Sequence, residues 1–384
     1  MRICFIGDGN SIHIMRMADW LRAHKCIVQL VHVSSVALES PVHYDHVLSL
    51  VEKPGLRGFL GRIPYVRAYV YAFQPDIVHG HYLTSGGFYA AMSGHPNVVV
   101  SAWGSDIYRD TKKPSRNLLV RYALKKCNAI TGGCDDIIRV IKSYHPKAHI
   151  HKFIVGPDTA IFIPKPELKG KIFTFLSGRA SRPIYNPIRI VRAFEFFNGN
   201  DWRLLLQRPT KPYPELEEIV QNSKQPWRPA NIEWYSVRDH SEMPDLFGQA
   251  NVTISVPDTD GGSALMLESM ACGVPVIASR IPQNDEWNGL GVYKPKDDSV
   301  KALAEVMDRV CKNPEETRKY GDFARSIIIQ KGEWDVQMYG MLRLYEAVRD
   351  GHYPRNRHLH SNMIPPAIDC DRWLWGVKEW KRQR

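Results

Sequence analysis

The sequence predicts two doubly wound α/β domains, each built on a parallel sheet. Short runs of β-branched residues alternate with helical patterns along almost the whole chain. The alternation starts twice, near residues 1 and 172, on either side of a proline-containing stretch. A chain of 384 residues is also too long for one ordinary hydrophobic core. We therefore expect residues 1–165 and 171–335 to form two domains of right-handed βαβ units.

The first domain is expected to begin with a strand at 3–6, a glycine turn and a helix. The apolar residues of that helix are Ile12, Met15, Ala18 and Leu21. Glycine in the turn at 7–9 satisfies the φ angles of a tight turn, and the free N–H groups of the helix start would equally suit a phosphate. The dinucleotide-binding pattern GxGxxG is incomplete, so that class of site is not predicted. Further strands are expected at 27–33, 76–79 and 97–101.

Polar residues follow two of these strands at their carboxyl ends, where open parallel sheets bind ligands. His79 and His81 are separated by one residue, but no third ligand stands at metal-binding spacing. A polar strand end that faces a cleft is therefore favoured over a metal site. Asp106 follows the strand at 97–101. It is either a functional carboxylate at that strand end or the cap of the next segment.

Two segments of the first domain are strongly basic. Residues 57–72 interleave arginines with aromatic and aliphatic residues, and residues 112–126 form a helical pattern with six lysines and arginines. A basic amphipathic helix can lie on an anionic membrane. An ordinary surface helix with a solvated charged face has the same pattern, so the sequence leaves both interpretations open.

The second domain is expected to follow a linker at 167–171, with a strand at 172–177 and a basic glycine turn. Arg179 and Arg182 lie in this turn, and guanidinium groups match the oxygens of a diphosphate in bidentate geometry. Further strands are expected at 203–206, 232–235, 252–256 and 276–278. Helices are expected at 187–197, 213–222, 241–248, 299–312, 315–329 and 334–349.

The most informative stretch is residues 250–279, which predict a strand, a glycine turn, a short helix and a second strand. It contains two acids eight residues apart, Asp260 in the turn and Glu268 in the helix. Glu268 lies about 100° around the helix from Leu267 on the apolar face, so it need not point into the core. Spacing alone explains the two acids equally well as surface residues or as part of a site.

Charge is distributed unevenly along the chain. Residues 1–165 contain 20 Lys and Arg against 11 Asp and Glu, a net charge of +9, so only +2 remains for the other 219 residues. A basic N-terminal half indicates an anionic partner, which could be a phosphorylated substrate, an acidic membrane surface or nucleic acid. Nucleic acid ranks last, because the sequence contains neither zinc-finger spacings nor an RNP-like aromatic motif.

Cysteine usage and the chain ends bear on the cellular compartment. The seven cysteines show no CxxC spacing and the N-terminus lacks a signal-peptide pattern, so we expect a cytoplasmic protein with reduced thiols. The tail at 370–384 contains three tryptophans close to several basic residues. This composition suits either an interfacial membrane anchor or a segment docked on the protein body.

Residues 1–349 resemble the GT-B glycosyltransferases, specifically the retaining glycosyltransferase family 4. The matching motifs are GDGNSIH at 7–13, HGHYLTSGG at 79–87, SAWGSDI at 101–107, GPDTAIF at 156–162, GRASRPIYN at 178–186 and DTDGGSALMLESMACGVPVIAS at 258–279. The last of these looks like the family's two-acid motif. The resemblance implies two Rossmann-like domains with an interdomain cleft, and a C-terminal segment at 336–384 that packs back on the N-terminal domain.

The resemblance also implies roles for individual residues. Glu268 would hold the ribose hydroxyls of a donor nucleotide, and Asp260 would contact the hydroxyls of the donor sugar. Asp106, beside the anomeric carbon, would be catalytic together with Asp260. The remaining donor-binding residues would be Gly9, Arg179, Arg182, Gly261, Gly262 and Ser263. Residues 258–260 match a DxD metal motif by letters only, so neither a metal nor another cofactor is expected.

The sequence departs from the family pattern at several of these positions. Asp260 replaces the usual glutamate, Tyr185-Asn186 stands where the family has a lysine, and Trp103 stands where many members have a histidine. Arg182 or Lys211 would have to substitute for the lysine.

The expected activity is transfer of a hexose-type sugar, with retention, from a nucleotide-diphosphate donor to a polysaccharide or glycolipid acceptor. UDP is the preferred nucleotide, and the inner face of a membrane is a possible location. Two alternatives stay open: a nucleotide-sugar epimerase of the same fold and a non-catalytic nucleotide-sugar-binding subunit. An epimerase would need acids paired with histidines in the cleft, and the sequence shows no such pairing near Asp260.

Overall fold

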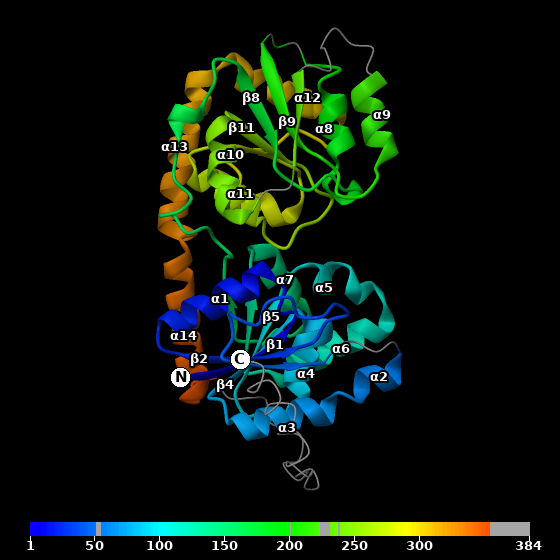
Figure 1. Cartoon of the computed structure of the whole chain (residues 1–384), viewed down its shortest axis with the longest axis vertical. Helices are drawn as coiled ribbons and strands as arrows, with labels where there is room; N and C mark the ends of the chain where they lie inside the picture. The colour runs from blue at the N-terminus through cyan, green and yellow to red at the C-terminus, as the bar shows by residue number, and fades with distance from the viewer. Residues whose placement is uncertain (51–54, 198, 200, 223–230, 237–238, 354–384) are drawn as a thin grey trace.

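The computed structural model describes residues 1–50, 55–197, 199, 201–222, 231–236 and 239–353, and it contains two parallel sheets, one above the other in Figure 1. The first sheet has seven strands in the order β3-β2-β1-β4-β5-β6-β7, and the second has six in the order β10-β9-β8-β11-β12-β13. Every strand pair among the described residues is parallel. The predicted pair of doubly wound sheets is confirmed.

The elements have the following bounds. The strands of the first sheet are β1 Arg2–Gly7, β2 Ile27–His32, β3 His46–Ser49, β4 Ile77–His81, β5 Val98–Ala102, β6 Ala129–Gly132 and β7 Ile150–Lys152. Its helices are α1 Ile12–Ala23, α2 Leu56–Leu60, α3 Ile63–Phe73, α4 Gly87–Met92, α5 Ser105–Tyr108, α6 Pro114–Lys126 and α7 Asp135–Tyr144. The strands of the second sheet are β8 Phe173–Ser177, β9 Trp202–Gln207, β10 Ile232–Tyr235, β11 Val252–Ser255, β12 Val276–Ala278 and β13 Val292–Tyr293. The later helices are α8 Pro187–Ala193, α9 Pro214–Asn222, α10 Met243–Gln249, α11 Ala264–Ala271, α12 Val300–Lys312, α13 Pro314–Lys331 and α14 Trp334–Arg349.

All the predicted strands form, and the structure adds four that sequence patterns missed: β3, β6, β7 and β13. These strands are two to four residues long, which is too short to produce a recognisable alternation. Three of them are edge strands, and the fourth, β6, lies next to the edge strand β7. The basic segment at 57–72 forms two helices, α2 and α3, and Pro64 lies in the first turn of α3, where proline is tolerated.

Each sheet reverses its winding direction at one place, between β1 and β4 in the first sheet and between β8 and β11 in the second. Open parallel sheets bind ligands outside the carboxyl ends of their strands at such a point. The loops after β5 and β6 contact the loop after β11, through glycines described below. The carboxyl ends of the two sheets therefore face each other across the domain boundary.

The chain returns to the first domain at its end. Helices α13 and α14 run along one side of both domains (Figure 1), and α14 buries Met338 and Met341 in the core cluster that contains Phe5 of β1. Two hydrogen bonds fix this contact: Trp20 Nε1 donates to Asp335 at 2.7 Å, and the Tyr345 hydroxyl pairs with His79 Nδ1 at 2.6 Å.

The domain limits at residues 165, 171 and 335 stay predictions. The two sheets themselves lie within residues 2–152 and 173–293. The predicted tail at 370–384 lies outside the described residues.

Candidate active site

Four glycines form a close contact between the two domains. A Cβ on Gly261, in the loop after β11, would lie 2.0 Å from the carbonyl oxygen of Trp103, and one on Gly104 would lie 2.5 Å from the Cα of Gly261. Gly262 has a φ of +113°, and its Cβ position is 3.5 Å from the Gly133 carbonyl. Backbone approaches this tight require residues without a side chain. We call this contact the glycine seam.

Arg179 and Asp260, both predicted site residues, form an ion pair with each other. The Arg179 guanidinium bonds Asp260 and the hydroxyl of Ser263, and its Nε lies 3.4 Å from the hydroxyl of Ser255 at the end of β11. The ring of Tyr185 lies 5.1 Å from the guanidinium carbon. The side chains of Arg179 and Asp260 are only 17% and 12% exposed. A guanidinium is thus held at the carboxyl ends of β8 and β11, at the reversal point of the second sheet.

Glu268 is buried in α11, the helix that follows the Asp260 loop. Its Oε1 pairs with Nε2 of His240 at 2.9 Å. Within the described part of the chain Oε2 makes no hydrogen bond, so it can still accept one. Ser263 caps the same helix by accepting a hydrogen bond from the N–H of Met266 at 3.2 Å. The free N–H groups of this helix start and the carboxylate of Glu268 therefore belong to one short element.

His240 is a site residue that sequence analysis missed. It lies in the turn between β10 and α10, and its ring also packs against Phe162, with 5.3 Å between centroids. The one sequence feature that could have indicated it is a histidine just beyond the carboxyl end of a predicted strand.

His13 and Arg16, at the start of α1, bring the first domain to the same site. His13 stacks on Trp103 with 5.6 Å between ring centroids. Burial lowers the pKa of His13 to about 4, and nearby Arg16 and His240 lower it further, whereas Glu268 and Asp260 oppose the shift. Burial also lowers the pKa of Arg16, which Glu268 and Asp158 oppose. His13 lies within the motif at 7–13, but the sequence did not predict a role for it.

His13 also carries a polar atom that lacks a partner among the described residues. Its Nδ1 is buried and makes no hydrogen bond with that part of the chain, and the same holds for Nε1 of Trp103. Buried polar atoms are nearly always paired, so these two are candidates for contact with a bound molecule. The site also contains an acid–histidine pair, Glu268 with His240, which the sequence did not indicate, whereas Asp260 pairs with Arg179.

Acid should destabilise the protein through His13. The unfolded chain, with a histidine pKa of about 6.5, binds a proton that the folded protein excludes down to about pH 4. The free energy of unfolding should therefore fall as pH falls through this window, by about 2 kcal/mol between pH 7.5 and 5 from His13 alone. Urea unfolding at both pH values measures the loss, and His13→Gln should remove that share of it. An unchanged pH dependence in the variant would contradict this assignment.

Asp106 lies just beyond the carboxyl end of β5, as predicted, and its catalytic role stays a prediction. It is completely buried, and its oxygens accept backbone N–H groups of Leu83 at 2.9 Å, Trp103 at 3.0 Å and Gly104 at 2.9 Å. Burial raises the pKa of Asp106 to about 6, although these hydrogen bonds oppose the shift. With both oxygens engaged inside the protein, it holds the loop that reaches the glycine seam. The structure thus gives Asp106 a positioning role.

Gly9 and Arg182 stand apart from the cluster. A Cβ on Gly9 would lie 2.4 Å from a methyl group of Leu30 and 2.7 Å from one of Leu38, so a side chain there would displace these leucines. Its N–H donates to His32 Nδ1 at 3.0 Å. Arg182 is exposed, and in the described part of the chain its side chain contacts none of the cluster residues.

The histidine pair at the end of β4 does not face a cleft, so that prediction is wrong. His79 and His81 are 0% and 1% exposed, and burial lowers the pKa of both. His79 bonds Tyr345 and Ser101, which ties α14 to the sheet. Among the described residues no group of three or more His, Cys, Asp or Glu is arranged to hold a metal ion.

Some arginines of the basic segment at 57–72 form hydrogen bonds within the first domain. Arg62 is buried and donates to the Tyr89 hydroxyl at 3.2 Å, and Arg67 donates to the Met92 carbonyl at 2.7 Å. Apolar side chains nearby are exposed, with Leu56 at 71% and Tyr71 at 77%. Among the described residues, no helix is both long and apolar enough to span a bilayer.

Two facing doubly wound sheets, with a guanidinium and a helix start at the reversal point of one of them, define the GT-B class. Two family models agree, "Glycosyl transferase 4-like" over residues 2–133 and "Glycosyl transferases group 1" over residues 164–327, which together span more than three quarters of the chain. The chain belongs to the group 1 glycosyltransferases, and it is therefore an enzyme that transfers sugars.

Individual relatives are distant. N-acetyl-alpha-D-glucosaminyl L-malate synthase of Bacillus anthracis is 23% identical over 300 residues, 72% of this chain and 76% of that protein. Sucrose-phosphate synthase from Thermosynechococcus elongatus superposes with a TM-score of 0.75 at 15% identity, covering 91% of this chain and all of that one. HepE of Anabaena, solved in complex with UDP and glucose, gives a TM-score of 0.74 at 14% identity, covering 90% of this chain and all of that one.

Proposed function

We propose that this glycosyltransferase takes a hexose from a UDP-sugar and transfers it, with retention, to a polysaccharide or glycolipid acceptor. The observation that carries the proposal is the Arg179–Asp260 ion pair at the reversal point of the second sheet, which Ser263 connects to α11, the helix that contains Glu268. HepE, which has the same fold, was solved with UDP and with UDP-glucose, and this supports the choice of nucleotide.

The chemistry of these groups fits a leaving nucleoside diphosphate. Negative charge develops on the diphosphate as the glycosidic bond breaks, and a fixed guanidinium and a helix N-terminus both stabilise such charge. Arg179 supplies the guanidinium, and the N–H groups at 261–264 supply the helix start. Protein groups alone can provide this stabilisation, so the proposed reaction needs no metal.

The acids would then orient the donor. The unpaired Oε2 of Glu268 would accept the ribose hydroxyls, and Asp260 would meet the sugar once the diphosphate has taken its place beside Arg179. His13 and Arg16 would close the site from the first domain. The net charge of +9 over residues 1–165 supports an anionic or membrane-associated acceptor on that side.

Incubation with a panel of nucleotide sugars tests the proposal. Purified protein is mixed with UDP-, GDP- and ADP-hexoses, with oligosaccharide or lipid-linked acceptors, in the presence and absence of anionic vesicles, and the anomeric configuration of the product is read by NMR. Release of UDP with an α-linked product from an α-donor is expected. If no nucleotide sugar reacts or raises the melting temperature at saturating concentration, the proposal is wrong.

Epimerisation of the donor is a second candidate, favoured by the histidines that face Asp260 and Glu268. Acid–histidine pairs can move protons at a sugar carbon. The same panel separates the two activities, because an epimerase changes the donor sugar without an acceptor.

Glu268→Gln should weaken nucleotide binding. A charge-assisted acceptor for two hydroxyls is lost, which should cost about 1.5–3 kcal/mol, or roughly 10- to 150-fold in Kd for UDP. Isothermal titration with UDP measures the change. Glu315→Gln, which changes an exposed carboxylate of α13 outside both sites, is the matched control and should bind UDP as the wild type does. Equal UDP affinity in the Glu268 variant would remove the ribose assignment.

A further inference from the structure

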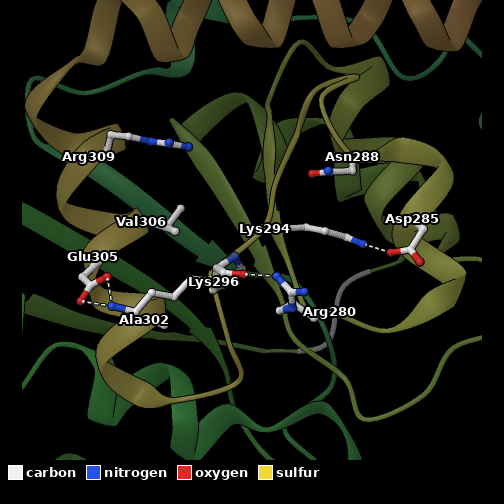
Figure 2. A pocket seen from close by; sticks show the side chains of 10 residues that line it. Arg280, Asp285, Asn288, Lys294, Lys296, Ala302, Glu305, Val306 and Arg309 are labelled. Carbon is white, nitrogen blue, oxygen red and sulfur yellow. Dashed lines mark hydrogen bonds and ion pairs between the residues drawn. The ribbon is translucent and has the colours of Figure 1, made fainter.

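A second cavity, of about 540 Å³, lies in the C-terminal domain, and none of its lining residues belongs to the site described above. Figure 2 shows it between the segments that leave β12 and β13 and one face of α12. The carboxyl ends of parallel strands are where open sheets bind ligands, and the volume is within the range of small-molecule sites. We call it the edge cavity.

The edge cavity concentrates positive charge. Arg280, Lys294, Lys296 and Arg309 line it against two acids, Asp285 and Glu305. This concentration is notable because residues 166–384 carry a net charge of only +2.

The two arginines make no ion pair within the described ranges, although Asp297 is close enough to Arg280 for the guanidinium to contribute to lowering the pKa of Asp297. Arg280 donates to the Pro295 carbonyl at 3.4 Å, and the Arg309 guanidinium lies 5.0 Å from the ring centre of Tyr293. Neither forms an ion pair with an acid in the described part of the chain. Guanidinium groups bind phosphate and carboxylate oxygens in bidentate geometry, so two unpaired ones on one cavity favour an anion.

The two lysines are paired, but with acids that a ligand can displace. Lys294 pairs with Asp285 and Lys296 pairs with Glu305, at 2.9 Å in the second case. Asp285 and Glu305 are 70% and 45% exposed, whereas the side chain of Lys294 is only 9% exposed. Exposed ion pairs contribute little free energy, so a ligand anion can replace Asp285 on Lys294 at small cost.

We propose that the edge cavity binds a small sugar that carries phosphate or carboxylate groups. Arg280 and Arg309 bind the anionic group through their guanidinium N–H donors, and Lys294 supplies a buried positive charge. The sugar is either an anionic unit of the acceptor or a free effector. Asp285 belongs to the segment 282–287, in which Gln283 donates a hydrogen bond to Asp136 of the first domain at 3.1 Å. A ligand in the edge cavity that displaces Asp285 would therefore shift a segment that contacts the first domain.

Binding measurements on the whole protein test the proposal without any assumption about the reaction. Glucose 6-phosphate and glucuronate are titrated calorimetrically against neutral glucose at about 0.1 M salt. The wild type is expected to bind the anionic sugars at least about tenfold more tightly than glucose. The double variant Arg280→Gln/Arg309→Gln should lose that preference. Lys301→Gln, an exposed cation of α12 outside the cavity, should keep it.

The two sources of the sugar are separated by kinetics. An effector changes the rate with a neutral acceptor, whereas an acceptor subsite raises KM for an anionic acceptor in the double variant and leaves a neutral acceptor unaffected. Either pattern supports the cavity as a site. Equal affinity of the wild type for glucose and glucose 6-phosphate overturns the proposal, as does a preference that survives in the folded double variant. UDP titration in the same samples shows separately whether the donor site is intact.

Discussion

Replacing Arg179 with glutamine is expected to lower kcat for the sugar donor by about two to three orders of magnitude. Removal of one fixed group that stabilises developing negative charge typically has this effect. Arg179 bonds both Asp260 and the helix cap Ser263, and no other side chain in the described part of the protein bonds both. Steady-state kinetics with the reactive donor from the panel gives the value.

The Arg179 variant needs a control for folding, because it leaves Asp260 without its partner at 12% exposure. Breaking a buried pair is destabilising, whereas removing both charges is much less so. The double variant Arg179→Gln/Asp260→Asn should therefore recover the melting temperature but not the turnover. Arg182→Gln, three residues along the chain and exposed, should lose far less activity. Wild-type kcat in the folded double variant would exclude Arg179 from the reaction.

Gly261→Ala is expected to reduce kcat/KM by about a hundredfold or more while leaving each domain folded. The new methyl group would lie 2.0 Å from the Trp103 carbonyl, so the glycine seam must open by more than an ångström. A misplacement of about 1 Å between reacting groups can cost about a hundredfold in rate. UDP affinity should change little, because Arg179 and Glu268 both belong to the second domain.

Kinetics, UDP titration and thermal unfolding of the same sample test this expectation. Gly170→Ala is the matched control, since its Cβ position has only one neighbour, at 4.0 Å, and it lies between the domains. Wild-type turnover in Gly261→Ala would mean that the seam is not part of the active arrangement. A parallel loss of UDP affinity would mean that the methyl group disturbs the donor side instead.

Much of the fold could be predicted because its cause is local. Strand β1 is buried from Ile3 to Gly7 as a continuous apolar run, β11 begins with three β-branched residues, and α11 is bounded by a capping serine and a glycine. The acids of the 250–279 stretch could be named from their spacing and from the family motif. The short strands β6, β7 and β13 could not be predicted, because two to four residues are too few to show a repeating pattern of apolar residues.

The identity of Arg179, Asp260 and Glu268 as candidate site residues was determined by the sequence alone. Which groups they meet was decided only by the tertiary structure. His13 and Arg16 lie on α1 of the first domain, so their approach to Glu268 depends on how the two sheets face each other. His240 reaches Glu268 from a turn of the second domain, 28 residues away in sequence. The burial of Asp106, His79 and His81 likewise depends on segments distant in sequence, such as Leu83 for Asp106 and Tyr345 for His79. Spacing along a chain fixes which residues share an element, whereas desolvation and pairing depend on neighbours far away in sequence that only the packed fold supplies.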